Sequence, residues 1–194
     1  MARVRSTIAA CNARRANMAE LVPYRPDEIL EVLERHKVRC VVIGGLAGEL
    51  RRSPYFTRDI DVTPARSREK LTKLAAALKE LDAKHRIPDV EEPLAIALDE
   101  RTFGQGTNWT FVTKHGYLDI ALRLDGTRGY DDLKRSATRE QITDSVTILV
   151  AALAGVIRSK EAAGHEKDRA VLPMLRQVLE RSRQKDRDNR RMGL

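Results

Sequence analysis

The chain is poor in cysteine and in aromatic residues, and it has no long apolar segment. Its two cysteines, Cys11 and Cys40, form no CxxC motif, and its four His show no HxxxH or HxH spacing. This spacing indicates neither a disulfide framework nor a zinc site. The longest apolar stretch, near residues 148–157, contains Gly155 and is shorter than the roughly 18 to 20 residues of a membrane-spanning helix. We therefore expect a cytoplasmic protein that does not cross a membrane.

An excess of positive charge is confined to the two ends of the sequence. The formal net charge is +8. Residues 1–25 carry five Arg and one Glu, residues 181–194 carry six Lys or Arg and two Asp, and residues 26–180 are neutral. Basic ends on a neutral body favour contact with a polyanion such as RNA or DNA, because neutralised phosphates supply affinity. Solvated, frayed termini are the alternative interpretation.

Residues 26–150 have the pattern of a small α+β core. Alternating apolar residues, glycines and prolines predict a small mixed or antiparallel sheet flanked by helices. Between residues 82 and 107, prolines and glycines break any long element, so short pieces and a mobile loop are expected there. We expect one compact domain overall, with a basic N-terminal arm at 1–25, the core at 26–150 and a C-terminal helical segment with a basic tail at 151–194. The expected helices are 27–37, 46–52, 67–81 and a long tract at 151–182, and the expected strands are 38–43, 57–63, 108–113, 117–122, 139–142 and 146–149.

Two acidic residues, Asp59 and Asp61, lie two positions apart in the alternating segment 57–63. In a strand both carboxylates project from one face, about 7 Å apart, while Ile60 and Val62 point to the opposite face. Two carboxylates so close repel each other unless a hard cation such as Mg²⁺ lies between them. The pair therefore predicts a metal site, although an exposed polar strand face is the simpler interpretation of a single Asp-x-Asp.

A third acid, Asp119, interrupts the apolar strand expected at 117–122. If this strand lies next to the strand of the acidic pair, three carboxylates converge on one or two metal ions. That arrangement serves in-line displacement at phosphorus. A salt bridge from Asp119 to Arg58 or Arg123 is the structural alternative.

Gly44 and Gly45 follow the buried strand expected at 38–43 and precede a short helix. Backbone N–H groups at such a bend can meet a phosphate, and an ordinary turn is the alternative. The glycines do not satisfy the GxGxxG fingerprint of dinucleotide-binding folds, and the sequence has no Walker motif. In combination, the glycine pair, the acidic pair and the later strand acid favour a metal site beside a phosphate-binding bend.

These residues resemble the motifs of the nucleotidyltransferase superfamily that includes DNA polymerase beta. The likeness lies in the glycine motif (Gly44 and Gly45), the acidic pair (Asp59 and Asp61) and the third acid (Asp119). More narrowly, the segments VVIGGLAGELRRSPYFTRDIDV, YLDIALRLDG and IRSKEAAGHEKDRAVLPMLR look like those of the AbiEii-type nucleotidyltransferase toxins, including the MenT proteins. The resemblance runs from about residue 38 to residue 179 and implies a polymerase beta-like nucleotidyltransferase fold with C-terminal helices.

The resemblance implies an enzyme that binds a nucleoside triphosphate with two Mg²⁺ ions, or with Mn²⁺, and transfers the nucleotide to a hydroxyl with loss of pyrophosphate. It implies that Asp59 and Asp61 hold both ions. Asp119 would bind the catalytic ion and help to deprotonate the attacking hydroxyl, and Gly44 and Gly45 would hold the triphosphate. The toxin branch implies that a pyrimidine nucleotide is added to the 3′ end of transfer RNA, which blocks aminoacylation, and that a cognate antitoxin restrains the enzyme.

Cations are expected to complete the nucleotide site. Many superfamily members have Gly-Ser at the bend and use the Ser hydroxyl on phosphate, whereas this chain has Gly45 and Leu46. We expect Lys160, on an amphipathic helix, to contact the nucleotide, with Arg51 and Arg52 as further candidates one turn after the glycines. Surface charges on a helix are the alternative interpretation of Lys160.

Thr57 lies two residues before the acidic pair, so its hydroxyl is expected near the metal site. In related toxins this position can be phosphorylated by a kinase-like antitoxin. A phosphate would add about −1.5 to −2 charge beside the acids and should inhibit nucleotide binding.

Three other functions remain open. The acceptor could be a small molecule such as an aminoglycoside, but a polycationic drug favours an acidic cleft and the sequence pI is about 9.8. It could also be a protein hydroxyl, as in AMP-transferring enzymes. A non-catalytic domain that binds RNA or a partner protein is the alternative from another class, and the intact acidic triplet argues against it.

Overall fold

The structure, a computed structural model, describes residues 22–88, 90 and 92–192. Its strands are β1 (Cys40–Ile43), β2 (Asp59–Pro64), β3 (Lys84–His85), β4 (Asn108–Thr113), β5 (Gly116–Ala121), β6 (Thr138–Gln141) and β7 (Thr147–Val150). Within the described part of the chain these seven strands form one sheet in the order β3-β4-β5-β2-β1-β7-β6. The sheet is mixed, because β2 runs parallel to β5 and β1 parallel to β7 while the other neighbours are antiparallel.

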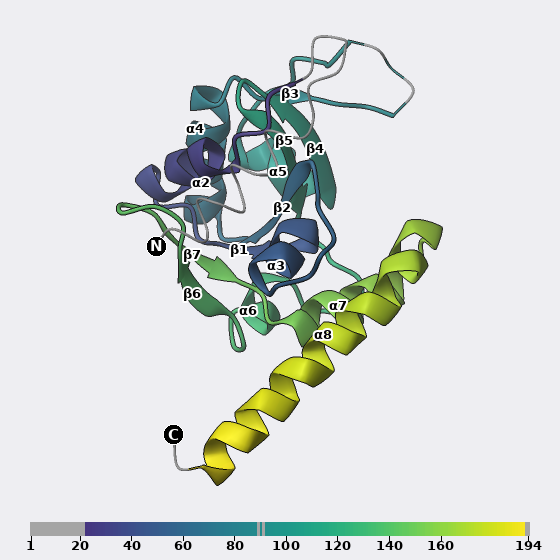
Figure 1. Cartoon of the computed structure of the whole chain (residues 1–194). Helices are drawn as coiled ribbons and strands as arrows, with labels where there is room; N and C mark the ends of the chain where they lie inside the picture. The colour runs from purple at the N-terminus through teal and green to yellow at the C-terminus, as the bar shows by residue number, and fades with distance from the viewer. Residues whose placement is uncertain (1–21, 89, 91, 193–194) are drawn as a thin grey trace.

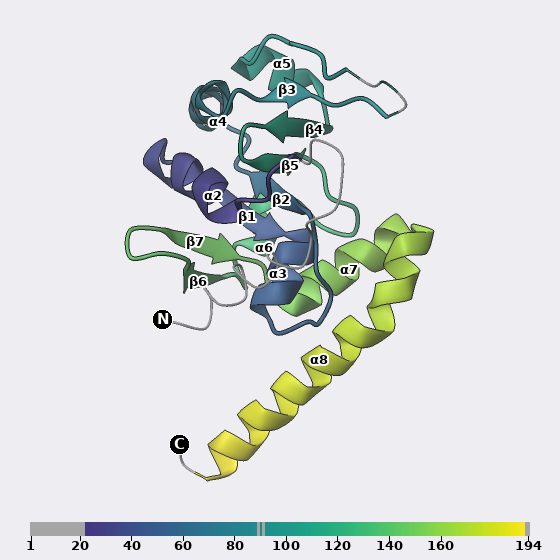
Figure 2. The ribbon, with the colours of Figure 1, turned by 45° about the horizontal axis from the view of Figure 1, so that its top comes forward.

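Helices pack on both faces of the sheet (Figures 1 and 2). They are α2 (Pro26–Arg35), α3 (Gly44–Leu50), α4 (Arg68–Glu80), α5 (Glu100–Gln105), α6 (Tyr130–Leu133), α7 (Leu153–Ala163) and α8 (Glu166–Arg191). α2, α4 and α5 cover one face, where Phe103 of α5 packs edge-on against Phe111 of β4 with ring centroids 6.3 Å apart. α3 and α7 contact each other, and α3 also contacts β1 and β2 from the other face. This α+β arrangement confirms the predicted fold class.

The strict alternation of β2 and β5 separates an apolar face from an acidic one. Ile60 and Val62 of β2, and Leu118 and Ile120 of β5, are almost completely buried. Because successive side chains of a strand point to opposite faces, the residues between these positions project from the other face of the sheet. Burial of the apolar face stabilises the two strands and fixes their register, since a slip by one residue would bury the acids.

The C-terminal helical tract differs from the prediction of one helix over 151–182. Two helices, α7 and α8, are separated at Gly164 and His165. Gly164 has φ +65°, a left-handed conformation that ends a helix and that glycine adopts without strain. α8 then continues to Arg191, beyond the predicted end. The break turns the chain so that the first turns of α8 pack back against α7.

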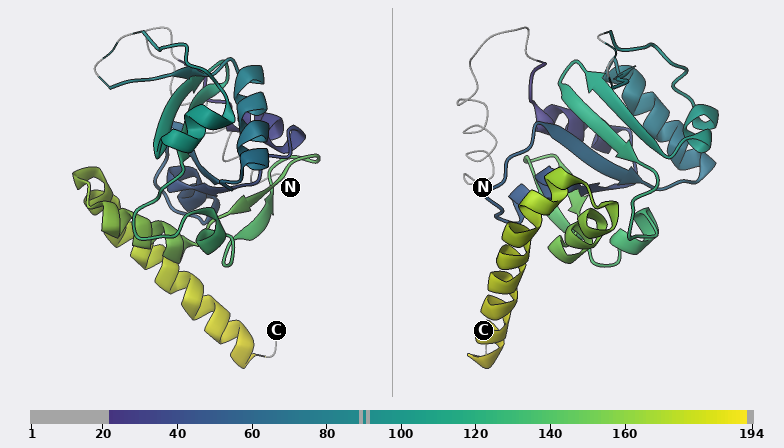
Figure 3. Two further views of the ribbon diagram at one scale, coloured as in Figure 1. Left: turned by 180° about the vertical axis from the view of Figure 1, so that it is seen from behind. Right: turned by 90° about the vertical axis from the view of Figure 1, so that its right-hand side faces the viewer.

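α8 is anchored through its N-terminal half. Its buried residues are Asp168, Val171, Leu172 and Leu175, which form one stripe at helical spacing. Beyond this stripe the helix extends away from the sheet (Figures 1 and 3). Its 26 residues span about 39 Å at 1.5 Å per residue. The six cations of residues 181–194 therefore lie on an exposed helix, at Arg181, Arg183, Lys185, Arg187, Arg190 and Arg191.

Other expectations for the chain are met in part. The hairpin of β4 and β5 is confirmed. α3 begins at Gly44 and not at Leu46, the segment 82–107 contains β3 and α5, and the short α6 is an addition to the predicted elements. Residues 1–21 of the predicted N-terminal arm lie outside the described residues. In the part of the chain that the structure covers, no helix has both the length and the apolar character needed to cross a membrane.

Candidate active site

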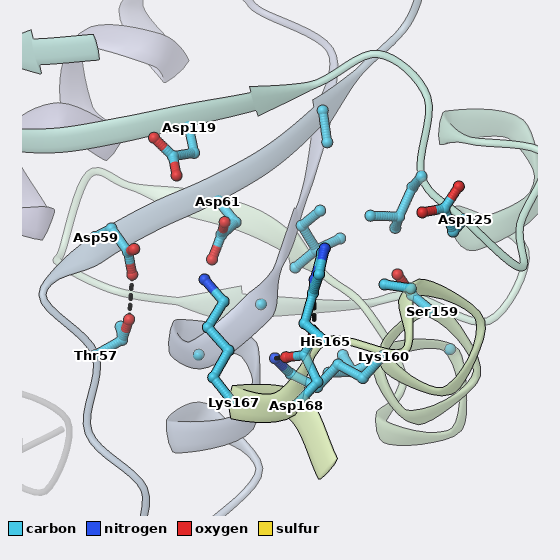
Figure 4. A pocket seen from close by; sticks show the side chains of 18 of the residues that line it. Thr57, Asp59, Asp61, Asp119, Asp125, Ser159, Lys160, His165, Lys167 and Asp168 are labelled. Atoms are coloured by element: carbon cyan, nitrogen blue, oxygen red, sulfur yellow. Dashed lines mark hydrogen bonds and ion pairs between the residues drawn. The ribbon is translucent and has the colours of Figure 1, made fainter. Parts of the chain in front are cut away.

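The structure brings the three predicted acids to one place on the sheet. β2 and β5 are neighbours, with Asp61 opposite Asp119 and Asp59 opposite Tyr117 in a parallel register. The three carboxylates therefore project from the same face of adjacent strands (Figure 4). Neither Arg58 nor Arg123 forms an ion pair with Asp119 among the described residues, so the structural alternative for this acid does not hold.

Burial and mutual repulsion raise the pKa values of two of these acids. The pKa of Asp61 is raised to about 7 by burial and by the charges of Asp59 and Asp119. The charge of Lys160 and the Gly45 N–H act in the opposite direction and lower this pKa. The pKa of Asp119 is raised to about 6 by burial and by Asp59. Asp119 Oδ1 is buried and has no hydrogen-bond partner among the described residues. The charges of Lys160 on Asp61, and of Arg86 and Lys167 on Asp119, only partly offset these effects.

The glycine bend packs directly against the acidic strand. Gly44 has φ +62°, and a Cβ atom at this position would lie 1.8 Å from Asp61 Oδ2. A Cβ atom at Gly45 would lie 2.4 Å from the Cβ of Thr57. The Gly45 N–H donates to the Asp61 carboxylate. Glycine is therefore required at both positions by the close approach of the bend to β2, and one of its N–H groups orients an acid.

Thr57 orients the first acid of the pair. Its hydroxyl donates to Asp59 Oδ1, and its backbone N–H donates to Glu49 Oε1 at 2.5 Å. Thr57 is buried. Its position beside the acids agrees with the expectation from sequence, and its hydroxyl is already occupied in holding Asp59.

A cavity of about 260 Å³ lies between the acids, the glycine bend and the two C-terminal helices. Lys160 and Ser159 of α7 line it, together with Lys167 of α8 and Tyr55 of the loop before β2. Lys167 points from α8 towards the acids (Figure 4). The cavity therefore combines an acidic wall with an opposite wall that carries two ammonium groups.

Lys160 is fixed by a partly buried ion pair between the two helices. Its Nζ lies 2.6 Å from Asp168 Oδ1, and His165 Nδ1 lies 3.2 Å from Asp168 Oδ2. Burial raises the pKa of Asp168, but the hydrogen bond and charge of Lys160, with those of His165, lower it below its usual range. The pair thus joins α7 to α8 and holds the Lys160 charge close enough to act on Asp61.

Arg51 and Arg52 are not brought to this cavity. The Arg51 guanidinium forms an ion pair with Glu140 at 2.7 Å and also donates to the Thr138 hydroxyl and the Val150 carbonyl. It joins α3 to the far edge of the sheet. Arg52 is exposed, with φ 70°, and it is not among the cavity residues. The helical spacing could not reveal this, because the contacts of Arg51 come from strands about 90 residues later.

The carboxylate oxygens of the three acids are suitable ligands for a divalent cation. Three carboxylates supply oxygen ligands, two of them have raised pKa values, and one buried oxygen is without a partner. Among the described residues, no three His, Cys, Asp or Glu side chains already stand close enough together to hold a metal ion. Carboxylates that repel one another would have to draw together around an ion, and their shared face allows this through side-chain rotation.

Two residues near the acids carried no signal in the sequence. Tyr55 is 41% exposed and lies at the cavity, and Arg86 is stacked over Tyr117, which lies two residues before Asp119 in β5. Both come from segments without periodicity, so only the three-dimensional structure shows that they lie near the acids.

Comparison with known proteins shows a likeness in structure only. No family model matches the chain, and no curated protein matches it in sequence. The lincosamide antibiotic adenylyltransferase LnuA, in its lincomycin-bound structure, superposes with a TM-score of 0.52 at 15% identity, over 79% of this chain and 95% of LnuA. A putative nucleotidyltransferase, TM1012 from Thermotoga maritima, superposes with a TM-score of 0.49 at 18% identity, over 81% of this chain and 96% of TM1012. The antibiotic-resistance factor ANT(2″)-Ia superposes with a TM-score of 0.49 at 12% identity, over 87% of this chain and 96% of ANT(2″)-Ia. The likeness to LnuA shows that this chain shares the fold of that protein.

Proposed function

We propose that the chain is a metal-dependent nucleotidyltransferase that transfers a nucleoside monophosphate from a triphosphate to a hydroxyl of RNA. The observation that carries this proposal is the placement of Asp59, Asp61 and Asp119 on one face of two adjacent strands, at the wall of a cavity that also holds cations. An acidic wall suits divalent cations, and the opposite ammonium groups suit the charge of a triphosphate.

Each side chain has a defined task in this reaction. Asp59 and Asp61 would hold two Mg²⁺ ions and Asp119 would join one of them; the ions would supply charge neutralisation at the α-phosphate. Lys160 and Lys167 bind the phosphates from the α7–α8 side. The acceptor oxygen forms a bond to the α-phosphorus, the bond to the bridging oxygen of the β-phosphate breaks, and pyrophosphate leaves. Asp119 Oδ1, which has no partner among the described residues, takes the proton of the acceptor hydroxyl.

The exposed end of α8 favours an RNA acceptor. Six cations lie on the part of the helix beyond the buried stripe, and the same helix contributes Lys167 to the cavity. A basic element of this length can contact the body of a folded RNA whose end enters the cavity. The 3′ end of transfer RNA, with addition of a pyrimidine nucleotide, is the acceptor that the sequence resemblance suggests.

A small-molecule acceptor is the second candidate. It is favoured by the likeness to LnuA, which acts on a lincosamide antibiotic. The exposed basic helix has no task in that reaction, and for this reason we prefer the RNA acceptor.

Restraint by an antitoxin completes the proposal. The resemblance to AbiEii-type toxins suggests a toxin whose cognate antitoxin, of a kinase-like kind, phosphorylates Thr57. The Thr57 hydroxyl is buried and donates to Asp59, so a phosphate there would displace that acid and repel a triphosphate. Thr57→Glu should then abolish transfer, and Thr57→Ala should escape inhibition by the antitoxin.

One incubation tests the reaction and its acceptor. The protein is mixed with each α-³²P-labelled triphosphate, Mg²⁺ and either total RNA or a panel of lincosamide and aminoglycoside antibiotics. Label on RNA of transfer-RNA size is expected, with a loss of about 10³-fold or more in Asp61→Asn and little change in Asp125→Asn, an exposed acid of the same cavity. Label on an antibiotic alone would favour the second candidate, and absence of label on every acceptor would contradict both.

A further inference from the structure

Arg86 presents an exposed guanidinium whose charge acts on the third acid. It follows β3, is exposed, and has no ion pair with a carboxylate among the described residues. Its guanidinium carbon lies 4.7 Å from the centroid of the Tyr117 ring. Exposed arginines without partners usually sample many rotamers, whereas this one is held by an aromatic face.

The backbone of Arg86 is fixed as firmly as its side chain. The Arg86 N–H donates to the Thr110 carbonyl at 2.8 Å, and the Thr110 hydroxyl donates to the Arg86 carbonyl at 2.5 Å. Thr110 lies opposite Asp119 in the pairing of β4 with β5. The chain therefore places Arg86 one strand away from Asp119, near enough for its charge to lower the pKa of that acid.

Stacking leaves the binding edge of the guanidinium free. A cation–π contact uses the flat face of the group, while its N–H donors lie in the plane and point outwards. An arginine in this state is suited to bind a phosphate through two parallel hydrogen bonds. Nothing in the described residues uses these donors.

Arg86 lies outside the cavity that suits the triphosphate. The cavity that suits the triphosphate is lined by Lys160 and Lys167, and Arg86 is not part of its lining. The face of β5 and β4 next to Arg86 carries Tyr117, Thr110 and Val112, which share the side of the sheet on which Asp119 projects. The right-hand view of Figure 3 shows no described helix in front of these strands. A group that lies over these strands beside Asp119 is within the influence of the Arg86 charge, which also acts on that acid.

We propose that Arg86, held by Tyr117, binds a phosphodiester of the acceptor strand, at one of the two linkages nearest its terminal hydroxyl. This assignment rests on the proposed function, since it takes Asp119 to be the residue that receives the acceptor hydroxyl. It names the acceptor by its chemistry: a single-stranded RNA end with a negative linkage beside the reacting hydroxyl. A cationic antibiotic has no such group and would be repelled by Arg86, so the residue selects RNA over small cationic acceptors.

Binding of short RNA tests this subsite without any need for transfer. A fluorescent single-stranded RNA is compared with two copies in which the first or the second linkage from the 3′ end is a neutral methylphosphonate. For the wild type, one neutral linkage should raise the dissociation constant about tenfold. Arg86→Ala should raise it by a similar factor for the natural RNA, and the same neutral linkage should then cause no further loss. Arg101→Ala, which removes an exposed arginine from α5 on the opposite face, is the matched control and should change nothing.

The outcomes separate this subsite from the proposed reaction. The assignment is overturned if the neutral linkage raises the dissociation constant by the same factor in the wild type and in Arg86→Ala. It is also overturned if Arg86→Ala binds the natural RNA with an unchanged dissociation constant, even when the wild type transfers label to RNA. The expected pattern of binding, combined with no transfer of label by the wild type, would uphold the subsite and reject the reaction. Arg86→Lys keeps the charge but loses the paired donors, and it should recover only part of the affinity. Thermal unfolding of each variant shows whether the fold is intact.

Discussion

Asp61 lies directly opposite Asp119 in the parallel pairing of β2 with β5, although 58 residues separate them in the chain. Burial and the charge of Asp59 raise the pKa values of both, because the three acids share one face of the sheet. The repulsion within this acidic cluster, the glycine bend beside it, the lysines opposite it and the exposed cations of α8 lead to four testable predictions.

The stability of the metal-free protein should fall as pH rises. Asp61 has a pKa of about 7 in the folded chain, against an ordinary value of 3.8 when unfolded. The folded state therefore holds more protons between these values, so the free energy of unfolding decreases as pH increases through that range. Asp61→Asn should unfold several degrees higher than the wild type at pH 8, and the difference should vanish near pH 4. Mg²⁺ should stabilise the wild type more at pH 8 than at pH 5, because ionised carboxylates bind it. A pH-independent difference between the two proteins would contradict this.

Alanine at the glycine bend should damage both the fold and the site. Gly44→Ala combines a left-handed backbone with a Cβ atom 1.8 Å from Asp61 Oδ2, and it should cost about 2 kcal/mol or more of the free energy of unfolding. Gly104→Ala is the control, because Gly104 lies in α5 with no atom near its Cβ position, and it should stabilise the chain by up to about 1 kcal/mol. Chemical denaturation measures both values. Equal effects of the two substitutions would show that the bend does not pack as described.

The ion pair of Lys160 with Asp168 should contribute to stability as well as to binding. Lys160→Met leaves the buried Asp168 with only the exposed His165 as a cationic partner and should cost about 2 kcal/mol. The double variant Lys160→Met, Asp168→Leu should recover most of this stability but remain inactive. Lys167→Met removes an exposed lysine of the same cavity, so it should leave the free energy of unfolding nearly unchanged while weakening triphosphate binding. Recovery of transfer in the double variant would exclude a role for Lys160 on the phosphates.

Removal of residues 181–194 should weaken RNA binding and leave triphosphate binding intact. The deleted part of α8 is exposed and carries six cations. For each phosphate that these cations no longer neutralise, the slope of log affinity against log salt should decrease by about 0.7 to 0.9. A full-length variant with these six cations replaced by Gln separates charge from helix length, and it should behave like the truncated chain. If the truncated chain binds RNA with wild-type affinity and salt dependence, α8 has no part in RNA recognition.

The acidic face could be predicted from the sequence because it depends only on the alternation of residues within a single strand. A strand repeats every two residues, so the alternation around Asp59 and Asp61 was sufficient to place both acids on one face. The single acid in the apolar strand of Asp119 was visible for the same reason. Whether the two strands are neighbours is decided by packing over the whole chain, and no periodicity reveals it.

Other features depend on distant partners or on single residues that end an element. Arg51 directly follows the helix that begins at the bend, but Glu140 and Thr138 of β6 bind its guanidinium. A glycine within a helical pattern does not by itself show that the helix ends, so the sequence did not predict the break at Gly164. Arg86 follows the two-residue strand β3, and the sequence did not predict that it would contact Tyr117 and Thr110 of the neighbouring strands.

Anomalous diffraction from crystals soaked with Mn²⁺ and a non-hydrolysable triphosphate tests the central claim most directly. We expect anomalous peaks within about 2.5 Å of carboxylate oxygens of Asp59, Asp61 and Asp119, with the triphosphate between these acids and the two lysines of α7 and α8. Manganese bound elsewhere, or a triphosphate bound away from the acids, would contradict the assignment of this cavity as a nucleotidyl-transfer site.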